Sequence, residues 1–452
     1  MKGIQILTDK NHDRLCVEVF PAERVARAQT LVTQNELATE GFYGFGVAIT
    51  PASCYLLAKM EKEERTALLQ SIYGKEGLGL SVARLCIGAS DYSAEVYSYD
   101  DVPFDTGLAH FSVARDEKYV IPMLKEILAI NPDLYLFASP WSPPGWMKTG
   151  GELCGGYMRA EFVDVYVDYI LKFLRAYAVH GIKISAITPQ NEPNTQQKGL
   201  MPACIWHPEI EADFIRKLRE KSTRLELDLK IWMFDHNFAD AGRVLWSLEH
   251  CKGLAKAVNG VAFHYYEGCI EETRPIKKAY PELELHFTEG GPRLYDHYAS
   301  DWCKWGAMIT KVLSHGFKSF TGWNLMLNEM GGPNVGPFSC GGLVTRDSVS
   351  GDISFSGQYR AFSHIAPYVT PNSKITPVTV DESFGEDMYA YPRQKCAPLG
   401  VCVENGDGKS VLLLCNPDAE KKMQVQFFAQ GVRWYAELPA DSISTFILSD
   451  SE

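Results

Sequence analysis

Residues 283–291, LELHFTEGG, form a short apolar run that ends in a carboxylate and two glycines. Leu283, Leu285, Phe287 and Glu289 alternate along this run, as side chains on one face of a β-strand do. We therefore expect an inward-facing apolar column that ends in Glu289 at the C-terminal end of a buried strand. A bare carboxylate there is costly, so it is expected to be either salt-bridged or chemically active.

Seven similar runs occur between residues 41 and 368, and amphipathic segments separate them. The eight expected strands begin at Gly41, Leu80, Asp133, Ile184, Leu229, Gly260, Leu283 and Ser319. In the segments between them, apolar residues recur at spacings of three and four, as on amphipathic helices. Eight such units predict an α/β fold, a closed parallel (β/α)8 TIM barrel over residues 41–370. A doubly wound open sheet is the alternative.

The two ends of the chain have a different pattern. From residue 371 to 452, short strand-like runs, among them DMYAYP (387–392), alternate with turn sequences such as NGDGK. Residues 1–40 also contain strand-like runs without a helical partner. We expect both regions to form one accessory β-sandwich.

Composition excludes several classes of function. The 452 residues are 46% hydrophobic, enough for a large core, and the net charge of -12 argues against a nucleic-acid partner. No apolar run is long enough to cross a bilayer, so no membrane insertion is expected. No signal-like segment occurs at the N-terminus, and the twelve cysteines are scattered without metal-ligand spacing. We therefore expect a cytoplasmic protein with free thiols, and neither a cofactor nor a metal.

A second carboxylate, Glu192, ends the fourth expected strand in the sequence TPQNEP. Active sites of TIM barrels lie at the C-terminal ends of the strands, so Glu192 and Glu289 should face each other across the barrel mouth. Such a pair suits glycosidic bond cleavage, in which one carboxyl group protonates the leaving oxygen while the other attacks or activates water. The alternative is that each carboxylate only pairs with a nearby Arg or Lys.

Aromatic residues accompany the two carboxylates. Trp141, Trp146, Tyr265, Tyr266 and Trp323 lie at the ends of different expected strands. Such rings stack on the apolar faces of sugars, although any one of them could belong to the core. We expect several of them to form a sugar-binding platform.

Amide and imidazole groups also occur at strand ends. Asn191 and Asn324 could bind sugar hydroxyls, or could simply form turns. His236 and His264 have no carboxylate or Cys at ligand spacing, which favours structural histidines over a metal site.

The motifs TPQNEP, SPWSPPGWMKTGG, FHYYEG, FTEGG and WNLMLNEMGGPN together resemble glycoside hydrolase family 30 of clan A, the family of lysosomal glucosylceramidase and its bacterial and fungal relatives. The resemblance implies a TIM barrel with an accessory β-sandwich and a retaining double displacement. In that mechanism Glu192 matches the family's acid/base and Glu289 its nucleophile. We expect the pKa of Glu192 to be raised, so that it holds a proton near neutral pH.

The resemblance also implies roles for other residues. Asn191 matches the residue that holds the sugar 2-hydroxyl, Tyr266 one that hydrogen-bonds the nucleophile, and Asp91 a reader of the outer hydroxyls. The substrate-binding set is Asp91, Trp141, Asn191, His264, Tyr266, Trp323 and Asn324, and the supporting residues are Arg84 and Tyr265. Arg84 and Asp91 fit the family pattern R-x-x-x-x-x-x-D-[FY]-S.

Asp91 favours a closed pocket, and therefore an exo-acting enzyme. We expect a retaining β-glycosidase acting on a carbohydrate or glycoside, with a terminal β-glucoside favoured. The alternatives within the family are a β-xylosidase, a β-fucosidase and a β-1,6-glucanase. Outside enzymes, the alternative is an inactive carbohydrate-binding protein.

Overall fold

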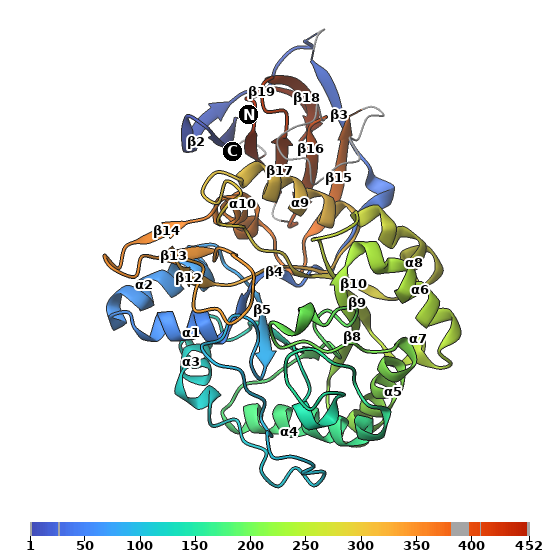
Figure 1. Ribbon diagram of the computed structural model, residues 1–452. Helices are drawn as coiled ribbons and strands as arrows, with labels where there is room; N and C mark the ends of the chain where they lie inside the picture. The colour runs from blue at the N-terminus through green and yellow to red at the C-terminus, as the bar shows by residue number, and fades with distance from the viewer. Residues whose placement is uncertain (1, 26–27, 381–396, 407, 450–452) are drawn as a thin grey trace.

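The computed structural model describes residues 2–25, 28–380, 397–406 and 408–449. Eight parallel strands close into a barrel in its lower part (Figure 1). The strands are β4 (Gly44–Ile49), β5 (Val82–Ile87), β6 (Tyr135–Pro140), β7 (Ala186–Ile187), β8 (Lys230–Asn237), β9 (Gly260–His264), β10 (Glu284–Glu289) and β11 (Ser319–Gly322). Each lies within one of the eight expected runs, so the predicted TIM barrel is confirmed and the open sheet is excluded.

Helices surround the barrel and cover its outer apolar face. They are α1 (Pro51–Ala58), α2 (Lys62–Tyr73), α3 (Val120–Ile130), α4 (Val163–Val179), α5 (Pro208–Arg224), α6 (Ala241–His250), α7 (Leu254–Ala257), α8 (Arg274–Ala279), α9 (Trp302–Ser314) and α10 (Gly357–Ile365). The main core lies between these helices and the strands. A small three-stranded sheet, β12 (Met326–Asn328), β13 (Val344–Arg346) and β14 (Ile353–Phe355), follows the last barrel strand.

The expected inward column on β10 is wrong. Leu285 and Phe287 belong to the outer core between barrel and helices, whereas His286 stacks inside the barrel on Trp232, with ring centroids 3.6 Å apart. The register between β9 and β10 shifts between Phe287 and Glu289, which is a β-bulge. The bulge lets Glu289 face the barrel mouth although it shares the parity of the outward residues.

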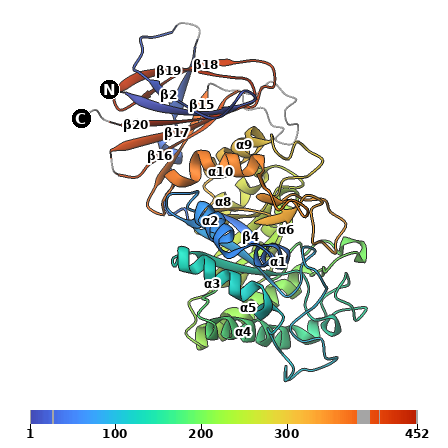
Figure 2. The same ribbon diagram turned by 90° about the vertical axis from the view of Figure 1, so that its left-hand side faces the viewer.

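Nine strands from the two ends of the chain form a separate, mostly antiparallel sheet (Figure 2). In spatial order they are β19 (Val432–Leu438), β18 (Met423–Ala429), β3 (Gln29–Thr33), β15 (Lys374–Val380), β16 (Leu399–Glu404), β17 (Lys409–Asn416), β20 (Ser442–Ser449), β1 (Gly3–Asp9) and β2 (His12–Val19). Phe427, Trp434 and Phe446 are part of its own apolar core, which is consistent with the predicted β-sandwich. The expected strand DMYAYP (387–392) lies outside the described residues.

Helix α9 joins the two parts, because one of its faces packs on β15, β16, β17 and β20. Gly306 permits this close approach. A Cβ atom at Gly306 would lie 2.8 Å from both the Cys415 Sγ and the Ile443 Cδ1 atoms. Within the described ranges, the search for membrane-spanning helices finds none with the length and apolar character to cross a bilayer.

We predict that Gly306→Leu lowers the free energy of unfolding by about 1–3 kcal/mol, because the new side chain overpacks the contact between α9 and the sheet. The matched control is Gly242→Leu in α6, where an added Cβ meets nothing within 4 Å. That exposed substitution should change stability by less than about 0.5 kcal/mol. Urea denaturation midpoints measure both, and equal losses in the two variants would contradict the close packing at Gly306.

Candidate active site

A cavity of about 590 Å³ opens at the C-terminal ends of the barrel strands. Its volume is typical of a small-molecule site. Seven of the predicted site residues line it: Asp91, Trp141, Asn191, Glu192, Tyr266, Glu289 and Trp323. Four others, Arg84, His264, Tyr265 and Asn324, are buried and do not line the cavity.

Glu192 and Glu289 converge from different strands, as the sequence predicts. Glu289 ends β10, and Glu192 follows β7 with a left-handed backbone (φ 53°) while its N–H donates to the Asp235 carbonyl oxygen. One carboxylate oxygen of each residue lies within 4.8 Å of the other. A positive φ at a non-glycine residue is unfavourable and is often found at functional sites.

A fully buried arginine compensates the charge of Glu289. Arg84, on β5, donates from Nη1 to Glu289 Oε2 at 2.5 Å and from Nη2 to both Asp235 Oδ2 and Asn191 Oδ1 at 2.8 Å. Burial lowers the pKa of Arg84, but the charges of Asp235 and Glu289 outweigh it, so the net shift is upward. Glu289 therefore does pair with a nearby arginine, as the alternative to a chemical role assumed. Among the described residues, Glu192 has no ion pair with Arg or Lys.

Asp235, at the bulged end of β8, was not predicted from the sequence. Its carboxylate accepts hydrogen bonds from Ser139, Thr188 and Thr288 at 2.8, 2.7 and 2.6 Å, in addition to the Arg84 ion pair. Burial raises its pKa, but these partners, Arg84 above all, lower it below the usual range. The two glutamates were identified as polar residues at the end of an apolar strand. The same criterion applied to the run LKIWMFDHN would have found Asp235.

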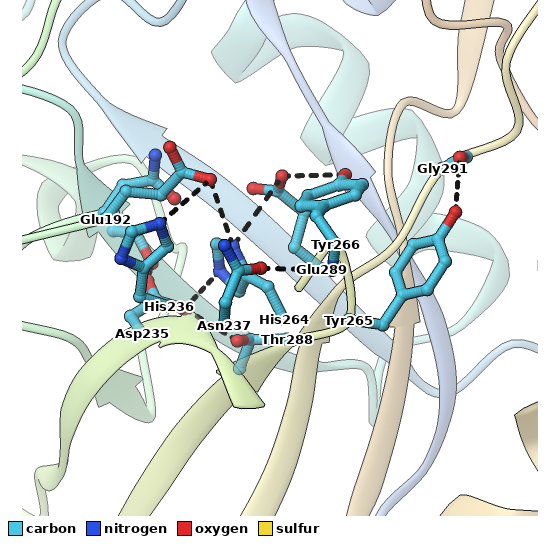
Figure 3. A network of polar contacts seen from close by, with 12 residues as sticks. Glu192, Asp235, His236, Asn237, His264, Tyr265, Tyr266, Thr288, Glu289 and Gly291 are labelled. Atoms are coloured by element: carbon cyan, nitrogen blue, oxygen red, sulfur yellow. Dashed lines mark hydrogen bonds and ion pairs between the residues drawn. The ribbon is translucent and has the colours of Figure 1, made fainter. Parts of the chain in front are cut away.

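His264, at the end of β9, lies between the two glutamates (Figure 3). Its Nε2 atom is 3.0 Å from Asp235 Oδ1, and its Nδ1 atom is 3.5 Å from Glu192 Oε1 and 3.9 Å from Glu289 Oε1. Burial lowers the pKa of His264, but the surrounding carboxylates, Glu289 first, raise it to about 9. Glu192, His264 and Glu289 have the residue types of a metal site, and their ligand atoms lie within 4.8 Å of one another.

The expectation of a raised pKa for Glu192 is wrong for this structure. Burial does raise the pKa, but His264, His236 and Gln197 favour the carboxylate more strongly and hold it well below its usual range. Gln197 donates from Nε2 to Glu192 Oε2 at 2.5 Å, and His236 Nε2 lies 3.8 Å from Oε1. Gln197 is only five residues further along the chain, but His236 and His264 come from β8 and β9, so the sequence around Glu192 does not reveal these two partners.

The cavity wall contains several predicted sugar-binding groups. Trp141 and Trp323 stack with ring centroids 5.1 Å apart, and Tyr266 donates from its hydroxyl to Glu289 Oε1 at 2.9 Å. Asp91 has a buried Oδ1 atom without a hydrogen-bond partner. Burial, followed by the charges of Glu289 and Glu192, raises the pKa of Asp91 well above its usual range. A buried polar atom without a protein partner in a cavity wall suits a ligand hydroxyl.

Other predicted residues pack behind the cavity. Tyr265 donates to the Gly291 carbonyl oxygen at 3.2 Å, and Asn324 Oδ1 accepts from Thr50 at 2.8 Å. Trp146 is buried and donates to the Asp100 carbonyl oxygen, so this aromatic residue is part of the core.

Asn237, the last residue of β8, is one cavity residue that sequence reasoning missed. The others lie in loops and short turns, and they are Asn194, Thr195, Gln197, Met201, Asp240, Glu267, Arg293, Phe338 and Cys340. No regular pattern marks them, because loop conformation rather than strand periodicity brings them to the cavity.

Comparisons with known proteins identify the family. The profile of the glycosyl hydrolase family 30 TIM-barrel domain matches residues 42–349. Lysosomal acid glucosylceramidase of Mus musculus is 26% identical over 89% of this chain and 82% of its own length. An endo-1,6-beta-D-glucanase of Neurospora crassa is 28% identical over 90% of this chain and 85% of its own length. A solved endo-beta1,6-glucanase superimposes with a TM-score of 0.85 and 25% identity, covering 99% of this chain and 100% of that one.

We predict that Arg84→Met lowers the free energy of unfolding by about 3–5 kcal/mol, because it leaves buried carboxylates without their cation. Arg224→Met is the control, since it removes an exposed ion pair with Glu220 on α5. The control should lose less than about 1 kcal/mol. Denaturation monitored by circular dichroism measures both, and a loss below about 1 kcal/mol for Arg84→Met would contradict the role of this arginine.

Proposed function

The chain belongs to glycosyl hydrolase family 30, and we propose that this glycoside hydrolase is a retaining, exo-acting β-glycosidase that removes a terminal β-linked glucose. One observation carries the proposal. Two carboxylates from different strands flank one cavity, with oxygens within 4.8 Å of each other. Carboxyl groups of retaining enzymes are about 5–5.5 Å apart, whereas inverting enzymes need room for a water molecule between them.

In this proposal Glu289 is the nucleophile. Its ion pair with Arg84 and its hydrogen bond from Tyr266 favour an ionised group and hold it in position for attack. Glu192, whose Oε2 atom is held by Gln197, acts as the acid and later as the base. Glu289 attacks C1 while the leaving oxygen takes a proton, and water then hydrolyses the glycosyl ester.

Other residues would bind the sugar or support the site. We assign Asn191 to the 2-hydroxyl, Asp91 to the outer hydroxyls, and the Trp141–Trp323 stack to an apolar face of the ring. Arg84 supports the nucleophile. Tyr265 and Asn324 support the wall of the cavity from behind, through hydrogen bonds with Gly291 and Thr50. His264 lies between the two carboxylates.

The names of the relatives support glucose as the released sugar. One relative is a glucosylceramidase and the other an endo-1,6-beta-D-glucanase, so glucose is common to both names. The buried, unpartnered carboxyl oxygen of Asp91 supports a closed pocket and thus exo action. Endo cleavage of a β-1,6-glucan is the second candidate, favoured by the 0.85 TM-score to a solved enzyme of that name.

We also propose the domain limits 1–40, 41–370 and 371–452 for the N-terminal strands, the barrel and the C-terminal part of the sandwich. A cytoplasmic location is proposed as well. The eleven cysteines in the described part of the chain are all free, which suits a reducing compartment.

We predict that Glu289→Gly lowers kcat/KM on an aryl β-glucoside by at least about 10³-fold, because the nucleophile is lost. Azide should restore part of the activity and yield a glycosyl azide, since the small anion can occupy the vacated space. Glu282→Gln, an exposed change just before β10, is the control and should retain wild-type rates. A Glu289→Gln variant within about tenfold of wild type would contradict the assignment.

Product analysis on a linear β-1,6-glucan separates the two candidate functions. Exo action predicts glucose as the sole early product, because a closed pocket admits only a chain end. A parallel panel of aryl β-glucoside, β-xyloside, β-fucoside and β-galactoside should show the highest kcat/KM for the glucoside. Early release of mixed oligosaccharides would favour the endo-glucanase, and turnover of no glycoside would favour a binding protein.

A further inference from the structure

Both carboxylates of the proposed reaction face one nitrogen atom. His264 Nδ1 lies 3.5 Å from Glu192 Oε1 and 3.9 Å from Glu289 Oε1 (Figure 3). The ring has no solvent exposure, and Nδ1 makes no hydrogen bond of normal length in the structure. A buried N–H group without an acceptor at hydrogen-bond distance is unfavourable. The position of Nδ1, just beyond that distance from two carboxylates, therefore suggests a function.

The other side of the ring is fixed. Nε2 lies 3.0 Å from Asp235 Oδ1, and Arg84 and three hydroxyl groups keep Asp235 ionised. The proton on Nε2 is therefore retained, because a permanent carboxylate accepts it. Nδ1 is the nitrogen that can exchange a proton.

The state of Glu192 raises a chemical problem. The first step of the proposed reaction needs a proton at Glu192, yet Gln197 donates a hydrogen bond to this carboxylate and both histidines favour its charged form. These contacts favour His264, rather than Glu192, as the group that carries the proton before the leaving group needs it. The nearest candidate donor is His264 Nδ1, 3.5 Å away.

We propose that His264 stores the proton of the acid/base cycle, releasing it through Glu192 when Glu289 becomes a glycosyl ester and taking it back when the ester is hydrolysed. This inference rests on the proposed double displacement. His264 does not touch the substrate in this scheme, so it is a positioning residue that acts through Glu192.

The proton balance closes at each step. In the first step a bond forms between a Glu289 oxygen and C1, and the bond from C1 to the leaving oxygen breaks with its electron pair on that oxygen. The leaving oxygen takes a proton from Glu192, which takes one from His264 Nδ1. In the second step water attacks C1, its proton passes through Glu192 to Nδ1, and Glu289 leaves as a carboxylate.

Charge explains the direction of transfer. The groups facing His264 are Glu192 and Glu289 on one side, Asp235 on the other, and His236 and Tyr266 at the edges. The charge of Glu289 is the largest of the contributions that raise the pKa of His264. Esterification removes that charge, so the pKa of His264 falls at the moment when the leaving oxygen needs a proton.

Histidine ¹⁵N NMR of the whole enzyme tests the inference directly. A 2-deoxy-2-fluoro-glucoside with an activated leaving group traps the glycosyl ester, and intact-mass spectrometry confirms that it has formed. At pH 7 we expect both nitrogens of His264 to carry protons in the free enzyme, and Nδ1 to be unprotonated in the trapped enzyme. The same spectra of His264→Gln, which lacks this ring, identify its signal among the eleven histidines.

Outcomes of this experiment separate the two proposals. An ester with His264 in the same protonation state before and after trapping would overturn the proton store and leave the double displacement standing. If no ester forms on Glu289, the proposed mechanism fails, and the proton store fails with it.

The pH dependence of kcat/KM gives a second readout. In the wild type the basic limb should follow the titration of His264, whose pKa is about 9. His264→Gln leaves the proton on Glu192 alone, so the basic limb should move down by at least about one pH unit on an aryl glucoside with a poor leaving group. In His250→Gln, which changes an exposed histidine of α6, the basic limb should stay in place. A lower rate in His264→Gln with an unmoved basic limb would indicate a structural histidine and overturn the inference.

Discussion

Arg84, His264, Asp235, Glu192 and Glu289 meet at the mouth of the barrel, and their mutual compensation of charge is the constraint on which the site depends. Arg84 and His264 carry two positive charges against the three carboxylates of Asp235, Glu192 and Glu289, which leaves one net negative charge. Isolated buried ions would be very unfavourable, whereas this arrangement gives each charge a partner. The surplus negative charge suits a transition state with oxocarbenium character.

The barrel could be predicted because its strands are buried on both faces and are therefore continuous apolar runs. Even β7, only two residues long, lies in a recognisable run that ends in Glu192. The sequence did not predict which side chains of β10 point into the barrel, because a bulge breaks the alternation before Glu289. A second register shift, in β8, accompanies positive φ at Phe234 and Asp235, and no simple residue pattern predicts it.

The candidate site was predicted to the extent that strand ends define it. Glu192, Glu289, Tyr266 and the two stacked tryptophans lie at such ends and reach one cavity. The protonation of Glu192 could not be predicted, because its charge depends mainly on His264 from β9 and His236 from β8, and less on the nearby Gln197. Contacts between side chains of different strands form only when the barrel closes, so the sequence around one residue does not predict them.

In the proposed mechanism the two glutamates act on opposite faces of one sugar in two successive displacements. Proton NMR of the first sugar released from an aryl β-glucoside tests this most directly, because the anomeric signals separate before mutarotation mixes them. Two displacements should release the β-anomer first, with the α-anomer appearing only later. Initial release of the α-anomer would contradict this mechanism.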